Sequence, residues 1–165
     1  MNNILDFRYI NYILLFLVYF IITFFLGYDT LNRYDYDLLL SEQGALSDVN
    51  TYIKTVENGL VGLYDNRFAP RILVPILSHL VYLVAENNIG SWNITFFSLL
   101  FVNSFFVALT CILIINITKI LNLGSPFLPA FFFITSFGVN SLFLSGLVDS
   151  SLCFFISFLI YGLLK

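Results

Sequence analysis

Two carboxylates are best placed to do chemistry, Asp48 and Asp149. Tyr52 follows Asp48 by four residues, so the two side chains share a face if this stretch is helical. Asp48 could take a proton from an incoming hydroxyl, although on the residues alone helix capping is its commoner role. Asp149 lies in Gly146–Ser151, at the start of a hydrophobic segment. There it is either a solvated helix end or a functional group at the membrane boundary.

Two arginines, Arg67 and Arg71, flank Phe68-Ala69-Pro70. Their long side chains suit anchoring at a bilayer surface, and their guanidinium groups suit binding of a lipid phosphate; both roles fit the residues. His79 has no second His or Cys at metal-ligand spacing, and no phosphate-binding glycine loop is present. The sequence therefore predicts neither a metal site nor a cofactor.

The composition is that of a membrane protein. The 165 residues are 59% hydrophobic, 19% aromatic and 10% charged, whereas soluble domains carry about 25% charged residues. Eleven of the seventeen charges fall between Tyr28 and Arg71. No basic run is present, which excludes nucleic acid as an expected partner. Cys111 and Cys153 lie in uncharged runs and predict no disulfide.

The first helix is expected from Tyr9 to Gly27, as a retained membrane span rather than a signal peptide. The polar loop 28–71 follows. Within it, Ser47 or Asp48 is a good N-cap and Gly59 a good stop. Apolar residues recur at helical spacing between them, namely Val49, Tyr52, Ile53 and Val56. This pattern predicts a short amphipathic helix on the membrane surface.

The uncharged run Ile72–Ala85 would cover about 21 Å as a helix, less than a hydrocarbon core of about 30 Å, and it contains Pro75. We expect it to be interfacial or partly inserted. Three further spans are expected, at about 92–118, 126–144 and 147–164. The predicted fold is thus an all-α integral membrane protein with about four transmembrane helices, plus interfacial amphipathic helices in the first extracytoplasmic loop.

The positive-inside rule orients this arrangement. If Ile72–Ala85 does not span, Arg8, Lys119 and Lys165 all fall on one side and the acidic loop falls on the other. We therefore expect a multi-pass protein of the cell membrane with a cytoplasmic N-terminus and an extracytoplasmic loop 28–71. Residues 1–165 form a single membrane domain, which we expect to be the N-terminal part of a larger one.

The motifs together resemble a known family. They are Ser47-Asp48-x-x-x-Tyr52, Leu63-Tyr64-Asp65, Arg67-Phe68-x-Pro70-Arg71-x-Leu73-x-Pro75-x-Leu77 and Ser145-Gly146-x-x-Asp149. Placed after a first membrane helix, they resemble the N-terminal part of the GT-C class of polytopic membrane glycosyltransferases. That resemblance implies transfer of a sugar from a polyprenyl-phosphate carrier to an extracytoplasmic glycan, lipid or protein acceptor.

The resemblance also implies roles for particular residues. Asp48 would be the general base, Arg67 and Arg71 would hold the carrier phosphate, and Tyr52 and Asp149 would shape the outer cavity. This sequence departs from branches of the class with paired acids at the first position. The pair of acids in Asp35-Tyr36-Asp37 is a rival for the catalytic position.

A second class of function is also open: a non-enzymatic polytopic membrane protein, such as an assembly subunit or part of a transporter. Transporters more often carry polar or broken helices near the membrane midplane. The expected spans here hold few ionisable groups, which favours the transferase.

Overall fold

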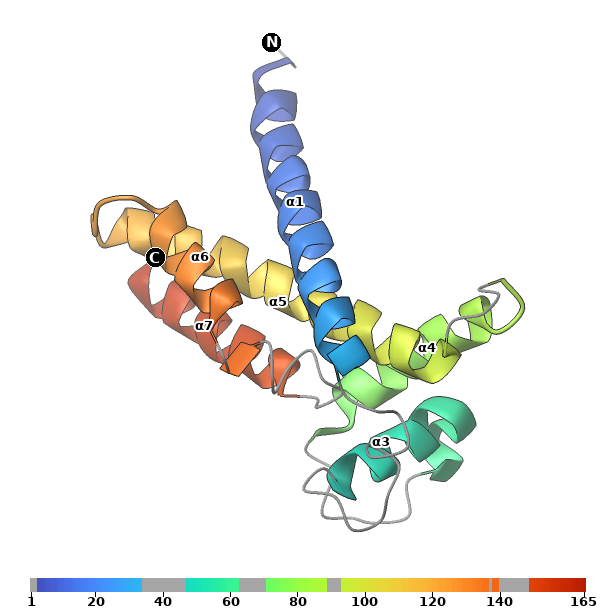
Figure 1. The fold of residues 1–165 in the computed structure, drawn as a ribbon. Helices are drawn as coiled ribbons and strands as arrows, with labels where there is room; N and C mark the ends of the chain where they lie inside the picture. The colour runs from blue at the N-terminus through green and yellow to red at the C-terminus, as the bar shows by residue number, and fades with distance from the viewer. Residues whose placement is uncertain (1–2, 34–46, 63–70, 89–92, 137, 140–148) are drawn as a thin grey trace.

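The computed structural model describes residues 3–33, 47–62, 71–88, 93–136, 138–139 and 149–165. Across these residues the chain is helical, without a strand, and this confirms the all-α prediction. The elements are α1 (Asn3–Arg33), α3 (Ser47–Asn58), the 3-10 helix η1 (Gly59–Gly62), α4 (Leu73–Ala85), α5 (Ile94–Ile120), α6 (Phe127–Thr135) and α7 (Ser150–Leu164) (Figure 1).

Helix α5 is the axis on which α1, α3, α4, α6 and α7 pack. Apolar and small side chains are buried along its whole length, because the segment is apolar on every face rather than along one stripe. The Asn93 side chain caps the start by accepting a hydrogen bond from the Phe96 amide, over 3.1 Å. Lys119 lies in the last turn, where a cation suits the negative end of the helix dipole.

Helix α1 runs antiparallel to α5 and crosses it in Figure 1. Three edge-to-face phenylalanine pairs show this direction, because the residue numbers of the paired rings rise along α1 and fall along α5. Their ring centroids are 5.4, 5.1 and 5.8 Å apart, for Phe16–Phe105, Phe20–Phe101 and Phe24–Phe97. The Tyr12 hydroxyl continues the series by donating to Asn116 Oδ1 over 3.0 Å.

Helix α7 runs parallel to α5. Its first residue, Ser150, contacts Asn103, and one turn later the Phe154 ring lies 5.7 Å from the Phe106 ring. Because α1 runs the other way, its N-terminus is directed toward the same end of the α5 axis as the C-termini of α5 and α7, although α1 diverges from these helices in Figure 1. We call this the basic end, since Lys119 and Lys165 close α5 and α7 there.

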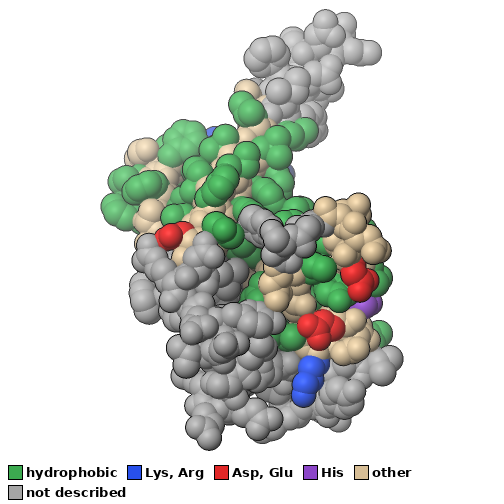
Figure 2. All heavy atoms as spheres, turned by 45° about the vertical axis from the view of Figure 1, so that its right-hand side comes forward, with side chains coloured by type: hydrophobic (Ala, Val, Ile, Leu, Met, Phe, Trp, Pro, Cys, Tyr) green, Lys and Arg blue, Asp and Glu red, His purple; other side chains and the backbone are tan. Residues whose placement is uncertain are grey.

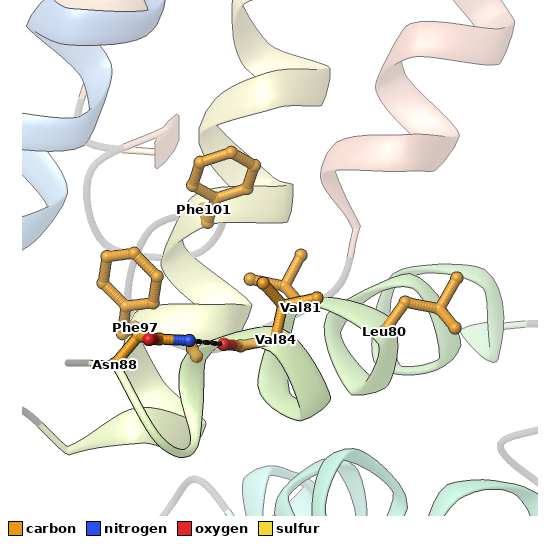
Figure 3. A pocket seen from close by; sticks show the side chains of 7 residues that line it. Leu80, Val81, Val84, Asn88, Phe97 and Phe101 are labelled. Carbon is orange, nitrogen blue, oxygen red and sulfur yellow. Dashed lines mark hydrogen bonds between the residues drawn. The ribbon is translucent and has the colours of Figure 1, made fainter.

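Helices α3 and α4 pack around the first turns of α5, at the opposite end. Figure 3 shows α4 lying across α5. A buried cluster joins the three helices: Tyr52, Val56, Val74, Leu99, Val102 and Phe106. Helix α3 has the bounds that Ser47 and Gly59 predict, and Gly59 ends it in the left-handed conformation, with φ of +62°. The Nδ1–H of His79 on α4 donates to the Val56 carbonyl over 2.7 Å, because a carbonyl can only accept.

The structure corrects the start of the polar loop. Helix α1 continues through Tyr28 and Asp29 to Arg33, so residues 28–33 are helical rather than the beginning of the loop. No proline interrupts this segment, and extension of an existing helix fixes only one residue for each new hydrogen bond. Residues 34–46 and 63–70 of the predicted loop lie outside the described residues.

Two of the four expected spans have the necessary length and apolarity in the part of the chain that the structure describes. They are Asn11–Asp29 within α1 and the whole of α5. Helix α7 is a shorter apolar helix of 15 residues, as α4 is with 13. The expected span 126–144 is wrong as one continuous helix, because α6 ends at Thr135 and Ser136 is extended, with ψ of 146°.

Replacing Gly59 with alanine should destabilise the protein. A left-handed conformation costs a non-glycine residue about 1–2 kcal/mol. The new Cβ would also lie 3.1 Å from His79 Nε2, so the ring would have to move. Gly124 is a matched control, with φ of +85° and no described atom within 4 Å of the place that an added Cβ would take. Thermal unfolding in detergent should show a larger loss for Gly59→Ala than for Gly124→Ala; equal losses would show that the His79 contact contributes nothing.

Candidate functional site

The structure brings together two of the predicted site residues, Arg71 and Asp149, which are far apart in the sequence. Arg71 Nε lies 3.3 Å from Asp149 Oδ1. Arg71 precedes α4, whose N-cap is Ile72, and Asp149 is the N-cap residue of α7. The Asp149 side chain makes no capping hydrogen bond to its own helix. Its carboxylate is instead directed to the arginine.

The ion pair is accessible to solvent. The Arg71 side chain is 50% exposed and the Asp149 side chain 28% exposed. A carboxylate that contacts one edge of a guanidinium group fixes the orientation of this planar group. The guanidinium carries N–H donors on more than one edge. Because the pair is reachable, an anionic ligand such as a phosphate could approach an arginine that is already oriented.

The ion pair does not lie beside the first residue of α5 but further along the helix axis. Ser150, next to Asp149, donates a hydrogen bond of 2.5 Å to Asn103 Oδ1. Asn103 follows Ile94 by nine residues, which places this contact about 14 Å along α5 at 1.5 Å per residue. Asn103 and Ser150 are both fully buried. The sequence singled out neither residue, although a carboxamide inside an uncharged run was a visible signal.

The other predicted residues have different positions. Asp48 falls in the first turn of α3, as expected, but its side chain lies outside the described residues. Tyr52 is 2% exposed and belongs to the cluster between α3, α4 and α5. It therefore packs inside this structure, and its role in substrate binding stays a prediction. Arg67 lies outside the described residues, as do Asp35, Asp37 and Asp65.

Two polar contacts lie near the same end, one between α3 and α5 and one at the C-terminal end of α4. The Thr95 hydroxyl donates to Glu57 Oε1 over 3.0 Å, and the Tyr82 hydroxyl lies 3.5 Å from Glu86 Oε1. Desolvation raises the pKa of Tyr82, and the charges of Glu86 and Glu57 raise it further, so this phenol stays neutral near pH 7. Figure 2 shows acidic, basic and histidine side chains close together on the lower right of one face, below a mainly hydrophobic region.

A cavity of about 580 Å³ opens between α4 and α5. Figure 3 shows that its walls are apolar side chains from both helices, with Asn88 at one side. The Asn88 carboxamide donates to the Val84 carbonyl over 2.7 Å. The lining residues are Leu80, Val81, Val84, Ala85, Asn88, Phe97 and Phe101. Sequence reasoning missed this cavity, because it depends on how α4 crosses α5.

No known protein family, curated protein or solved structure matches this chain significantly.

The ion pair should contribute little to stability. Because half of the Arg71 side chain is exposed, water screens the attraction, and exposed pairs contribute about 0–1 kcal/mol. A double-mutant cycle with Arg71→Met and Asp149→Asn, followed by unfolding in detergent, should give a coupling energy in that range. A coupling of about 3 kcal/mol or more is typical of breaking a buried pair, and it would contradict the solvated site described above.

Proposed function

We propose that this chain acts in a GT-C-like membrane glycosyltransferase, which moves a sugar from a polyprenyl-phosphate carrier to an extracytoplasmic acceptor. The observation that carries the proposal is the contact of Arg71 with Asp149. These residues come from two of the separate motifs on which the resemblance depends. Their meeting supports reading those motifs as one site.

The directions of the helices support a membrane topology for this enzyme. With α1 and α5 antiparallel and α5 and α7 parallel, Lys119 and Lys165 lie at the basic end, and Arg8 falls in the first turns of α1 at that end. By the positive-inside rule this end is cytoplasmic. Helices α3 and α4 are then extracytoplasmic. The apolar surface of α1 supports contact with lipid, because Ile13, Leu14 and Phe25 are 60–66% exposed.

The proposed reaction is a direct displacement at the anomeric carbon. A carboxylate, assigned to Asp48, accepts the proton of the acceptor hydroxyl. The hydroxyl oxygen forms a bond to the anomeric carbon. The bond from that carbon to the carrier phosphate oxygen breaks, and polyprenyl phosphate leaves with the electron pair. Attack from the opposite face inverts the anomeric configuration.

The arginines stabilise the leaving group in this scheme. Negative charge grows on the carrier phosphate as the glycosidic bond breaks, and a fixed guanidinium near that phosphate lowers the barrier. Arg71 is assigned to this role, with Asp149 holding its side chain, and Arg67 is assigned as the second phosphate ligand. Tyr52 supports α3 by packing against α4 and α5.

One observation favours the alternative, a non-enzymatic membrane protein such as an assembly subunit or part of a transporter. Helix α6 is apolar but only nine residues long, and the chain becomes extended at Ser136. Short or interrupted hydrophobic helices often line the binding sites of transporters. In that case the Arg71–Asp149 pair would bind an anionic solute without any chemical step.

The variant Asp48→Asn tests the proposal. Asn caps a helix about as well as Asp, so the fold should be retained. A positioned general base is worth about 10²–10⁴ in rate, and turnover should fall by that factor. The measurement is transfer from a polyprenyl-phosphate sugar donor, with Asp65→Asn as the control that should keep most activity.

The other outcomes of this assay identify a different catalytic base or favour the non-enzymatic alternative. Activity that survives in Asp48→Asn but is lost in Asp35→Asn or Asp37→Asn would assign the base to the rival acidic pair. A second outcome is that the wild-type chain and all of these variants bind the donor equally well but none transfers sugar. The protein would then be a transporter part or an assembly subunit rather than an enzyme.

A further inference from the structure

Asn103 is an unusual residue for its position. It lies within Ile94–Ile120, one of the two candidate membrane spans, and it is fully buried. Burying a carboxamide costs free energy unless its polar atoms are hydrogen-bonded, and polar groups within membrane segments usually have a specific role.

One hydrogen bond of Asn103 joins α5 to another helix, unlike those of three other polar residues on α5. The hydroxyls of Ser98, Thr110 and Thr118 each donate to a carbonyl four residues earlier in the same helix. They are satisfied locally and join no other helix through those bonds. Asn103 Oδ1 instead accepts from the Ser150 hydroxyl of α7.

The partner of Asn103 is adjacent to the ion pair. Ser150 is the first residue of α7, and the preceding residue, Asp149, contacts Arg71. Asn103 and Ser150 are fully buried, and a hydrogen bond is electrostatically stronger in the low dielectric of a protein interior than in water. The contact therefore ties the first residue of α7, and with it the neighbouring Asp149 backbone, to the level of Asn103 on α5.

We propose that Asn103 is a positioning residue, which acts through Ser150 to hold Asp149 opposite Arg71. The arrangement links the interior of the helix bundle to the exposed ion pair in one sequence of contacts: Asn103, Ser150, Asp149 and Arg71. The inference depends on the proposed function only in treating the ion pair as a substrate site. Its geometric content can be tested without a transfer assay.

Chemical cross-linking provides the test. Cysteines replace Arg71 and Asp149 in a full-length chain in which Cys111 and Cys153 are changed to alanine. A short bismaleimide then joins positions 71 and 149, and mass spectrometry measures the linked peptides. Because the ion pair is absent from this protein, the yield reports only how the backbone holds the two positions.

Three further substitutions are compared in that background. Asn103→Leu removes the acceptor and keeps the same branched arrangement of side-chain heavy atoms, and Ser150→Ala removes the donor with little change in packing. Thr110→Val is the matched control, because Thr110 is as buried on the same helix but donates within it. We expect Asn103→Leu and Ser150→Ala to lose most of the cross-linked product, and Thr110→Val to retain it.

A merely structural role for Asn103 has a different signature. It would lower the unfolding temperature of Asn103→Leu while leaving the cross-linking yield of the folded protein unchanged, and that result would overturn the proposal. Equal losses in Thr110→Val, or an unchanged yield in Ser150→Ala, would also overturn it. If Asn103→Leu does not fold, the Ser150→Ala yield decides alone. Cross-linking that follows the expected pattern supports the positioning role even if sugar transfer is never observed.

Discussion

Burial of α5 on several sides is the constraint on which the rest of the structure depends. One helix cannot bury an apolar surface that extends all round it, so α1, α4, α6 and α7 each cover part of it. Particular contacts show the directions of the helices: edge-to-face phenyl pairs lie between α1 and α5, and the Asn103–Ser150 hydrogen bond and the Phe106–Phe154 ring contact lie between α5 and the start of α7. These directions place Lys119 and Lys165 at one end of α5, and α3 and α4 around its first turns at the other end.

The position of the candidate site follows from the same packing. Because α7 begins beside the interior of α5 rather than at its start, Asp149 is recessed, and Arg71 reaches it from the turn before α4. The result is a solvated ion pair above a buried polar contact, within a largely apolar bundle. Charges in such surroundings are tolerated because each has the other as a partner and both side chains remain partly exposed.

Local signals in the sequence predicted much of the fold. The bounds of α3 follow from Ser47 and from Gly59, whose left-handed conformation only glycine adopts without strain. The expected segments Ile72–Ala85 and 92–118 were also close to α4 and α5, since each is an uncharged run with polar or charged residues at its ends. The break at Ser136 was missed although Gly138 follows two residues later, because an isolated glycine inside an apolar run is tolerated within a helix.

The site was predictable only in part. A charged residue beside a hydrophobic segment identified Arg71 and Asp149 as candidates, but no local pattern showed that they meet. Their contact depends on how α4 and α7 are placed on α5, and so does the role of Asn103. The cavity between α4 and α5 has the same origin: Phe97 and Phe101 read as ordinary helix-packing residues until α4 crosses them.

The most direct test of this account is labelling of single cysteines at the two ends of the molecule in intact cells. Asn50→Cys places a thiol on α3, and Leu123→Cys places one just after α5, where the native side chain is 66% exposed. Both are made in a chain with Cys111 and Cys153 changed to alanine, and an impermeant thiol reagent is applied. The account predicts labelling at position 50 in intact cells and at position 123 only after lysis. Labelling of position 123 in intact cells, or of position 50 only after lysis, would contradict it.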